Sequence, residues 1–280
     1  MKKATMLLAA LTLLVLAAGT ANAETYVEGY LGNNFTVTSP NPLELDINPL
    51  FRGPAKADLE FPRTVSSAFM VGAKLGIWFS KQGFPRFDYP DWMKYVGVYL
   101  DFNFHGFDKS DLTFNTMGSR RMYLPLTNYP YFQNYKFWLR KDASIITLAF
   151  MFAIRYGFNP TEQVPFGKWQ PYVAVGPALF ITSMKPTFKI QPTNTFFPVV
   201  AETGIDYESS FKSTVSLGLA TEIGLRYMIR RFLSVETSVK YRYTRPSTTY
   251  DLDIFGFTHQ LRYAPQFNLF SIHAGVAYHF

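Results

Sequence analysis

The feature that most constrains the fold is a two-residue alternation of apolar residues with polar or small ones, which returns along the chain in segments of about ten residues. It is clearest at the end of the chain, where Phe270, Ile272, Ala274, Val276, Tyr278 and Phe280 alternate with Ser271, His273, Gly275, Ala277 and His279. Successive side chains of a β-strand point to opposite faces, so this pattern predicts a strand with one apolar face.

Seven further segments alternate in the same way or nearly so. With the last one, the predicted strands cover about residues 26–35, 69–79, 96–104, 144–157, 171–182, 215–227, 233–244 and 270–280. The fifth is weakened by Pro177, which cannot donate to a strand ladder. The polar set of these strands is small and glycine-rich, as the interior of a narrow barrel requires, whereas a soluble β-sandwich would expose many charged residues there.

The predicted connections alternate in length. Long ones cover residues 37–66, 107–143, 183–212 and 245–266, and short ones cover 81–93, 158–170 and 229–232. Long loops on one side and short turns on the other are typical of outer-membrane barrels. We therefore predict an all-β fold for residues 24–280, an eight-stranded antiparallel up-and-down transmembrane β-barrel. The alternative is ten strands, if residues 107–143 form a membrane-spanning hairpin.

Residues 1–23 read as a secretory signal peptide. Lys2 and Lys3 precede an apolar run, which is shorter than the about 20 residues of a spanning helix, and Ala21-Asn22-Ala23 is a signal-peptidase site. We expect cleavage before Glu24 and localisation in the cell outer membrane. The absence of cysteine excludes a lipoprotein anchor, disulfides and thiolate metal sites. The formal net charge of +7 is spread along the chain, so it suits an anionic lipid surface but not nucleic acid.

The face opposite the apolar one carries charges of both signs. If it lines the lumen, the lumen contains Glu28, Lys74, Asp101, His105, Arg155, Glu222, Arg226, Glu236, Lys240, Arg242 and His273. An eight-stranded barrel has room for little more than side chains, so we expect these charges to pair and close the lumen. The alternative is a narrow, porin-like channel for small or hydrophobic solutes.

The register of the strands 215–227 and 233–244 follows from keeping their apolar residues on one face. It sets Arg226 opposite Glu236 and Glu222 opposite Lys240, two pairs of opposite charge. We expect the turn to consist of three residues, Arg230-Arg231-Phe232.

The sequence contains no clear catalytic or metal motif. Ser271 and His273 share one strand face, but positions two apart are about 6.6 Å apart along a strand, too far for a direct hydrogen bond. The four histidines form no HExxH motif. We predict no catalytic, metal or cofactor-binding residue and therefore no enzyme, with a lipid A-modifying enzyme as a further alternative.

The chain also resembles a known group of proteins. The ending FSIHAGVAYHF resembles the C-terminal strand signature of bacterial outer-membrane proteins. The resemblance implies that the barrel-assembly machinery reads this strand, through Ile272, Ala274, Val276, Tyr278 and Phe280. Segments such as YVEGYLGNNF, QPYVAVGPAL and LATEIGLRY resemble the small eight-stranded barrels related to outer membrane protein A and the opacity proteins. This second resemblance implies an architecture and no particular activity.

The connection 107–143 combines basic and aromatic residues. We single out Arg120, Arg121, Tyr131, Lys136, Trp138 and Arg140 as a surface-binding set, because such residues suit the phosphates and sugars of lipopolysaccharide or a protein surface. The alternatives are a cap of self-packed aromatics and a hairpin that lengthens the barrel wall. The expected function is that of a monomeric integral outer-membrane barrel with a structural or surface-interaction role, in contact with outer-membrane lipid and lipopolysaccharide and with no nucleic acid or cofactor.

Overall fold

The computed structural model describes residues 24–38, 42–47, 55–60, 64–79, 90–106, 111–124, 127–192, 205–208, 211–254 and 257–280. The expected signal peptide, residues 1–23, lies outside these ranges. Among the described residues no helix is long and apolar enough to cross a membrane.

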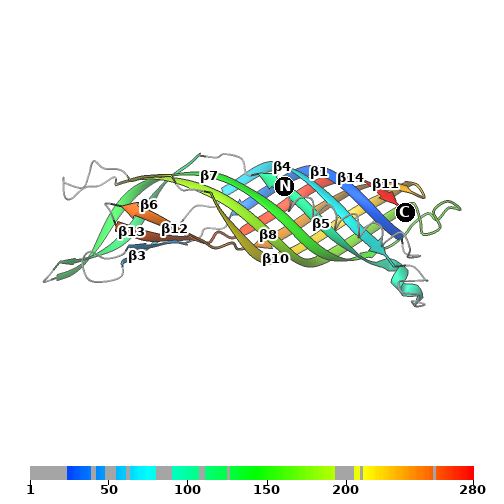
Figure 1. The fold of residues 1–280 in the computed structure, drawn as a ribbon, viewed down its shortest axis with the longest axis horizontal. Coiled ribbons are helices and arrows are strands. Elements are labelled where there is room, and N and C mark those ends of the chain that lie inside the picture. Colours follow the sequence, from blue (N-terminus) through cyan, green and yellow to red (C-terminus); the bar gives the residue numbers. More distant parts are fainter. Residues whose placement is uncertain are drawn as a thin grey trace, which may run out of the picture.

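Eight antiparallel strands close into a barrel, which confirms the predicted fold class (Figure 1). They are β1 (Glu24–Thr38), β4 (Thr64–Trp78), β5 (Val96–Gly106), β7 (Thr127–Arg155), β8 (Trp169–Pro192), β10 (Lys212–Arg230), β11 (Leu233–Thr244) and β14 (Phe267–His279). Each pairs with the next, and β14 returns to pair with β1, with Phe35 opposite Phe270 and Val27 opposite Tyr278. The ten-stranded alternative is wrong, since the eight strands already close the ring and none of the other described strands lies within it.

The two faces of the wall differ as the alternation predicts. Apolar side chains on the outer face are exposed, for example Leu217 at 78%, Phe69 at 64% and Ile272 at 56%. Their neighbours in sequence, such as Ser271 and His273, are buried. A continuous apolar outer surface of this size needs an apolar solvent, which a bilayer supplies.

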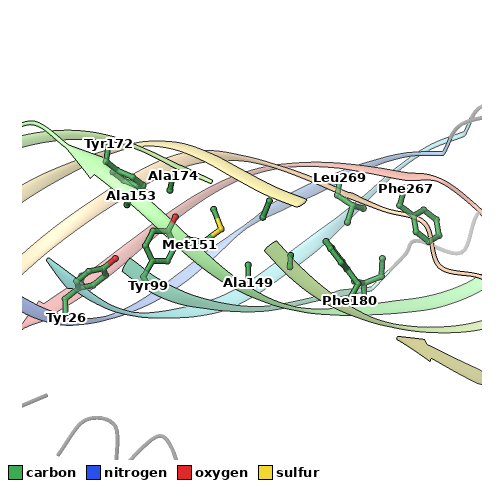
Figure 2. Packing of buried hydrophobic residues seen from close by; sticks show 14 of the residues in the cluster. Tyr26, Tyr99, Ala149, Met151, Ala153, Tyr172, Ala174, Phe180, Phe267 and Leu269 are labelled. Atoms are coloured by element: carbon green, nitrogen blue, oxygen red, sulfur yellow. The ribbon is translucent and has the colours of Figure 1, made fainter. Parts of the chain in front are cut away.

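The lumen is packed with side chains. Figure 2 shows the rings of Tyr26, Tyr99 and Tyr172 toward one end of the lumen, and Phe180 toward the other. Glycines make room for these rings. A Cβ atom on Gly72 would lie 2.2 Å from the Tyr30 ring, and one on Gly224 would lie 2.4 Å from the Tyr172 ring. The small inward residues therefore let large inward side chains fill a narrow interior.

Several strands extend the wall at one end of the barrel. β6 (Asp111–Leu124) pairs with the first half of β7, and β9 (Ile205–Glu208) pairs with the end of β8. A separate four-stranded sheet contains β2 (Pro42–Ile47), β3 (Ala55–Glu60), β12 (Thr248–Ile254) and β13 (Phe257–Tyr263). Figure 1 shows β3, β6, β12 and β13 together at the left, with the C-terminus at the right.

These outer strands correct the prediction of four long loops. Apart from β6 they have only 4–7 residues, so none offered the alternation over about ten residues on which the strand prediction relied. Of the three interpretations of residues 107–143, the described backbone supports the hairpin that lengthens the wall, because β6 pairs with β7 from Asp111 opposite Arg140 to Leu124 opposite Thr127.

The opposite end has short connections and carries both ends of the described barrel chain. The backbone N–H of Phe280 donates a hydrogen bond to the carbonyl of Thr25 at 2.9 Å. A short 3₁₀ helix, η1 (Asp91–Tyr95), precedes β5. Because outer-membrane barrels have short periplasmic turns, this end faces the periplasm and the extended end faces the outside.

Pro177 interrupts the ladder between β7 and β8, as expected from its missing N–H. Pairing runs to Ala149 opposite Ala178 and resumes at Phe152 opposite Val175, with no pairing for the two positions between them.

The β10–β11 hairpin confirms the predicted register but not the predicted turn. Arg226 lies opposite Glu236 and Glu222 opposite Lys240. The register then shifts between Met228 and Arg230, and Arg230 pairs with Leu233 across a two-residue turn. The three-residue turn is therefore wrong. A β-bulge takes up the extra residue, so a tight turn can close the hairpin without moving the lumen-facing residues above it.

Candidate functional site in the charged lumen

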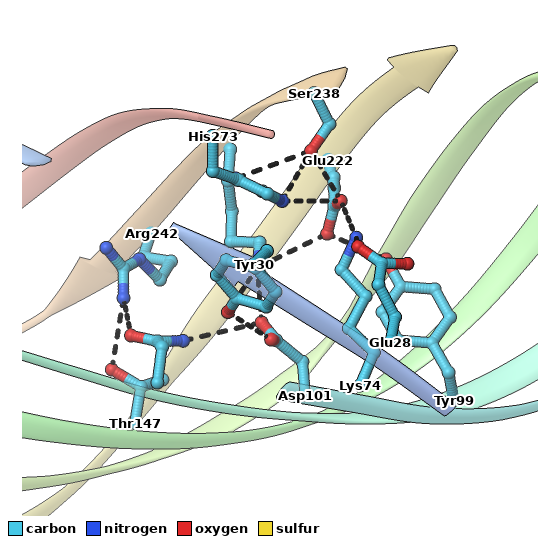
Figure 3. Close-up of polar contacts among 12 residues, drawn as sticks. Glu28, Tyr30, Lys74, Tyr99, Asp101, Thr147, Glu222, Ser238, Arg242 and His273 are labelled. Atoms are coloured by element: carbon cyan, nitrogen blue, oxygen red, sulfur yellow. Dashed lines mark hydrogen bonds and ion pairs between the residues drawn. The ribbon is translucent and has the colours of Figure 1, made fainter. Parts of the chain in front are cut away.

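The ammonium group of Lys74 lies at the centre of the lumen. Its Nζ is 2.6 Å from Oε1 of Glu222 and 3.2 Å from Oε1 of Glu28, and it also forms an ion pair with Glu236. These partners come from β1, β10 and β11, whereas Lys74 lies on β4. Figure 3 shows its side chain reaching across the lumen. One cation thereby links four strands across the barrel.

Arg226 extends this cluster toward the periplasmic end. Its Nη2 lies 2.7 Å from Oε2 of Glu236 and 3.3 Å from Oε2 of Glu28, and its Nε donates to the same Glu236 oxygen at 3.0 Å. The guanidinium carbon is 4.1 Å from the centre of the Tyr26 ring. The predicted Arg226–Glu236 contact is confirmed, and it shares its carboxylates with Lys74.

Lys240 extends the cluster in the other direction. Its Nζ is 2.5 Å from Oδ2 of Asp101 and 3.4 Å from Oε2 of Glu222, so the predicted Glu222–Lys240 pair is present but is not the shortest contact of either residue. The hydroxyl of Tyr30 donates to Oδ1 of Asp101 at 2.5 Å. Three cations thus meet four carboxylates in one connected network.

Two predicted members lie toward the outer end of this network. Arg242 donates to neutral side-chain oxygens, to Asn34 at 2.7 Å, to Thr147 at 3.3 Å and to Asn103. His105 is buried, on a rung opposite Met70. Both residues therefore line the lumen, as predicted, but apart from the central ion pairs.

Arg155 closes the periplasmic end. Its Nη2 lies 2.5 Å from Oε2 of Glu24, and its Nη1 donates to Gln170 at 3.0 Å. The guanidinium carbon is 4.3 Å from the Trp78 ring. The other oxygen of Glu24 is 3.1 Å from Nδ1 of His279. The first residue of β1 is thereby tied to β7 and to the end of β14.

The network also includes residues that sequence reasoning missed. Tyr99 donates to Glu222 at 2.9 Å, Tyr172 donates to the same carboxylate at 2.5 Å, and Ser238 donates to it at 2.8 Å. All three occupy inward positions of their strands and are buried. Their inward position follows from the alternation in the sequence, but a neutral hydroxyl carries no charge that would indicate an ionic partner.

A group that resembles a hydrolase triad lies in this network. Nε2 of His273 is 2.6 Å from Oγ of Ser238 and 3.5 Å from Oε1 of Glu222. Each of these residues is at most 3% exposed. A serine nucleophile must reach its substrate, and this hydroxyl is enclosed. His273 also lies near Glu28 and Glu236, close enough for the three to hold a cation, but the Lys74 ammonium already contacts both carboxylates.

The charged side chains of the lumen are almost completely buried. All eleven predicted lumen residues are at most 4% exposed. Ions this deeply buried are stable only when they are paired and hydrogen-bonded, and the central ones are. The predicted surface-binding residues Arg120, Arg121, Tyr131, Lys136, Trp138 and Arg140 lie on β6 and β7; only their strand positions are described, with Arg120 opposite Tyr131.

A closed barrel with an apolar outer face and a polar, ion-paired interior defines an outer-membrane type of β-barrel. The chain belongs to the outer membrane protein beta-barrel domain family, whose profile matches residues 6–280.

Solved structures of small bacterial barrels are similar to this chain. The outer membrane protein OprG from Pseudomonas aeruginosa shares 15% identity over 90% of this chain and 95% of its own, with a TM-score of 0.43. Neisserial surface protein A shares 10% identity over 91% of this chain and 97% of its own, with a TM-score of 0.39. Ail of Yersinia pestis, in complex with the heparin analogue sucrose octasulfate, shares 10% identity over 92% of this chain and 99% of its own, with a TM-score of 0.32. Comparison with curated proteins gives no match.

Proposed function

We propose that this protein is a non-conducting, non-enzymatic barrel of the outer membrane, which acts as a structural element and presents its extended outer strands for surface interactions. The observation that carries the proposal is the Lys74 ammonium, held across the lumen by Glu28, Glu222 and Glu236. A solute would have to separate these ions, and separating buried ion pairs is costly. Two serine–histidine contacts are described in the lumen, Ser238–His273 and Ser234–His279, and the burial of all four residues likewise argues against hydrolysis there.

Biogenesis is part of this proposal. Cleavage before Glu24 would free the start of β1, whose carboxylate contacts Arg155 and His279. We propose that the outward residues Ile272, Ala274, Val276, Tyr278 and Phe280 serve as the signal for the barrel-assembly machinery. N-terminal sequencing of the mature protein tests the cleavage site.

The closed lumen predicts the behaviour of the protein in liposomes. Vesicles that contain the folded barrel should swell in an isotonic arabinose solution no faster than protein-free vesicles. Vesicles with a general porin at equal protein content are the positive control. Swelling that rises in proportion to the amount of folded barrel would support the narrow channel instead.

For the surface role we propose lipopolysaccharide as the partner of the β6–β7 hairpin. β7 has 29 residues, whereas a membrane-spanning strand needs about 9–11, so the hairpin reaches the level of the lipopolysaccharide sugars and phosphates. Lys136, Trp138 and Arg140 occupy every second position of this part of β7, so they share one face of the strand.

Substitution of the hairpin cations tests this partner. Replacing Arg120, Arg121, Lys136 and Arg140 by glutamine should reduce the lipopolysaccharide retained by the purified barrel several-fold, because each lost cation removes a charge-assisted contact with phosphate. Lys212→Gln, a cation on β10, is the matched control. Equal retention by the hairpin variant and the control would contradict the proposal.

A further inference from the structure

The bulge in the β10–β11 hairpin changes the direction of one arginine. Above the bulge, the even-numbered residues of β10 face the lumen, as buried Glu222 and Arg226 do. Simple alternation would therefore direct Arg230 inward. Because the register shifts before it, Arg230 instead pairs with Leu233, which shares its face with the exposed Val235. A bulge commonly re-aims a side chain in this way.

The re-aimed arginine lies on the outer rim of the periplasmic end. Arg230 and its neighbour Arg231 are both exposed, and neither forms an ion pair or side-chain hydrogen bond with the described residues. The backbone of Lys168 lies beside this hairpin, since its carbonyl accepts a hydrogen bond from the N–H of Met228 at 2.8 Å. Two consecutive arginines are thus exposed at one turn with no carboxylate partner among the described residues.

Aromatic rings that are exposed or half-buried border these cations on both sides. On one side the rings of Trp169 and Tyr227 are 4.6 Å apart, and on the other the ring of Phe232 lies 5.9 Å from that of Tyr278. Leu233 pairs with Tyr278, so Arg230, Leu233 and Tyr278 share one outward rung. Tyrosine and tryptophan collect at the membrane–water boundary, so the cations lie at the level of the lipid headgroups.

We propose that Arg230 and Arg231 bind the phosphate of an anionic phospholipid in the periplasmic leaflet of the membrane. Arginine suits this ligand because its planar guanidinium can donate two parallel hydrogen bonds to one phosphate. The exposed rings of Trp169, Phe232 and Tyr278 would contact the glycerol and upper acyl chains of the same lipid. The proposal rests on the orientation of the barrel and not on the closure of its lumen, so the two can fail separately.

Fluorescence quenching by brominated phospholipids tests the proposal. In a Trp92→Phe, Trp138→Phe background, Trp169 on the outer face reports lipid contact, because the remaining Trp78 is buried in the lumen. Quenching is measured in phosphatidylcholine vesicles that contain either brominated phosphatidylglycerol or brominated phosphatidylcholine. We expect the folded barrel to prefer phosphatidylglycerol about five-fold or more, since each cation near an anionic surface contributes roughly that factor.

Variants distinguish a local site from general surface charge. The Arg230→Gln, Arg231→Gln double change should bring the preference close to one, and 0.5 M salt should do the same. Arg245→Gln, an exposed arginine just beyond the outer end of β11, is the matched control and should keep the preference. The proposal is overturned if the starting protein shows no preference, if the double variant keeps it, or if Arg245→Gln loses it equally. Heat-modifiable gel mobility identifies the folded fraction of each variant. Arg230→Lys keeps the positive charge and should therefore keep most of the preference for phosphatidylglycerol.

Discussion

Replacing Lys74 by methionine should lower the free energy of unfolding of the barrel by about 3–5 kcal/mol, because it leaves buried carboxylates without their shared cation. Methionine keeps most of the side-chain volume, so the loss reports charge and not a cavity. Glu28, Glu222 and Glu236 would then depend mainly on Arg226 and Lys240. Urea unfolding of the barrel in lipid vesicles measures the change.

Two further variants show whether pairing causes the effect. Lys212→Met removes a partly exposed lysine that lies 3.7 Å from Asp251, and such a surface pair contributes only about 0–1 kcal/mol. Adding Glu222→Gln and Glu236→Gln to Lys74→Met should restore part of the stability, because fewer charges remain unpaired. A loss in Lys74→Met no larger than that in Lys212→Met would show that the central ions do not hold the barrel together.

Glu222 and Lys240 should be strongly coupled in a double-mutant cycle. Glu222→Ala leaves Lys240 with Asp101 as its remaining ion-pair partner among the described residues, and Lys240→Ala leaves Glu222 with Lys74 as its nearest cation. Each single change therefore costs stability partly through the ion left behind. The double change removes both ions, so it should destabilise less than the two single changes added together, by about 0.5–3 kcal/mol.

The same cycle with Arg245→Ala in place of Lys240→Ala is the control and should be additive within about 0.5 kcal/mol, because Arg245 is exposed at the outer end of the hairpin. Additive behaviour of Glu222 and Lys240 would mean that their contact carries no energy of its own.

The alternation of apolar residues was enough to predict the strands, their inward faces and the register of one hairpin. It could not predict the contacts across the lumen. Lys74 and Glu222 are 148 residues apart in sequence, and their meeting depends on how strongly the closed sheet is staggered. The alternation places Lys74 and Glu222 in the lumen, but it identifies ion-pair partners only between adjacent strands and not across the barrel.

The turn at Arg230 shows a second limit. Strand register is set by which residues must face lipid, and that demand ends where the strand leaves the membrane. Beyond Met228 a bulge with a two-residue turn and a plain three-residue turn satisfy the residues above them equally well. The outer strands β2, β3, β12 and β13 are too short to show a period, and backbone pairing alone reveals them.

Single-channel recording in a planar lipid bilayer tests the closed lumen most directly. Folded barrel, identified by its heat-modifiable mobility, is inserted into the bilayer in 1 M KCl at neutral pH, and the current is followed at fixed voltage. Because carboxylates hold Lys74, Arg226 and Lys240 in the lumen, we expect no current steps above those of protein-free bilayers. Reproducible steps of one size, in number proportional to the folded protein added, would contradict it.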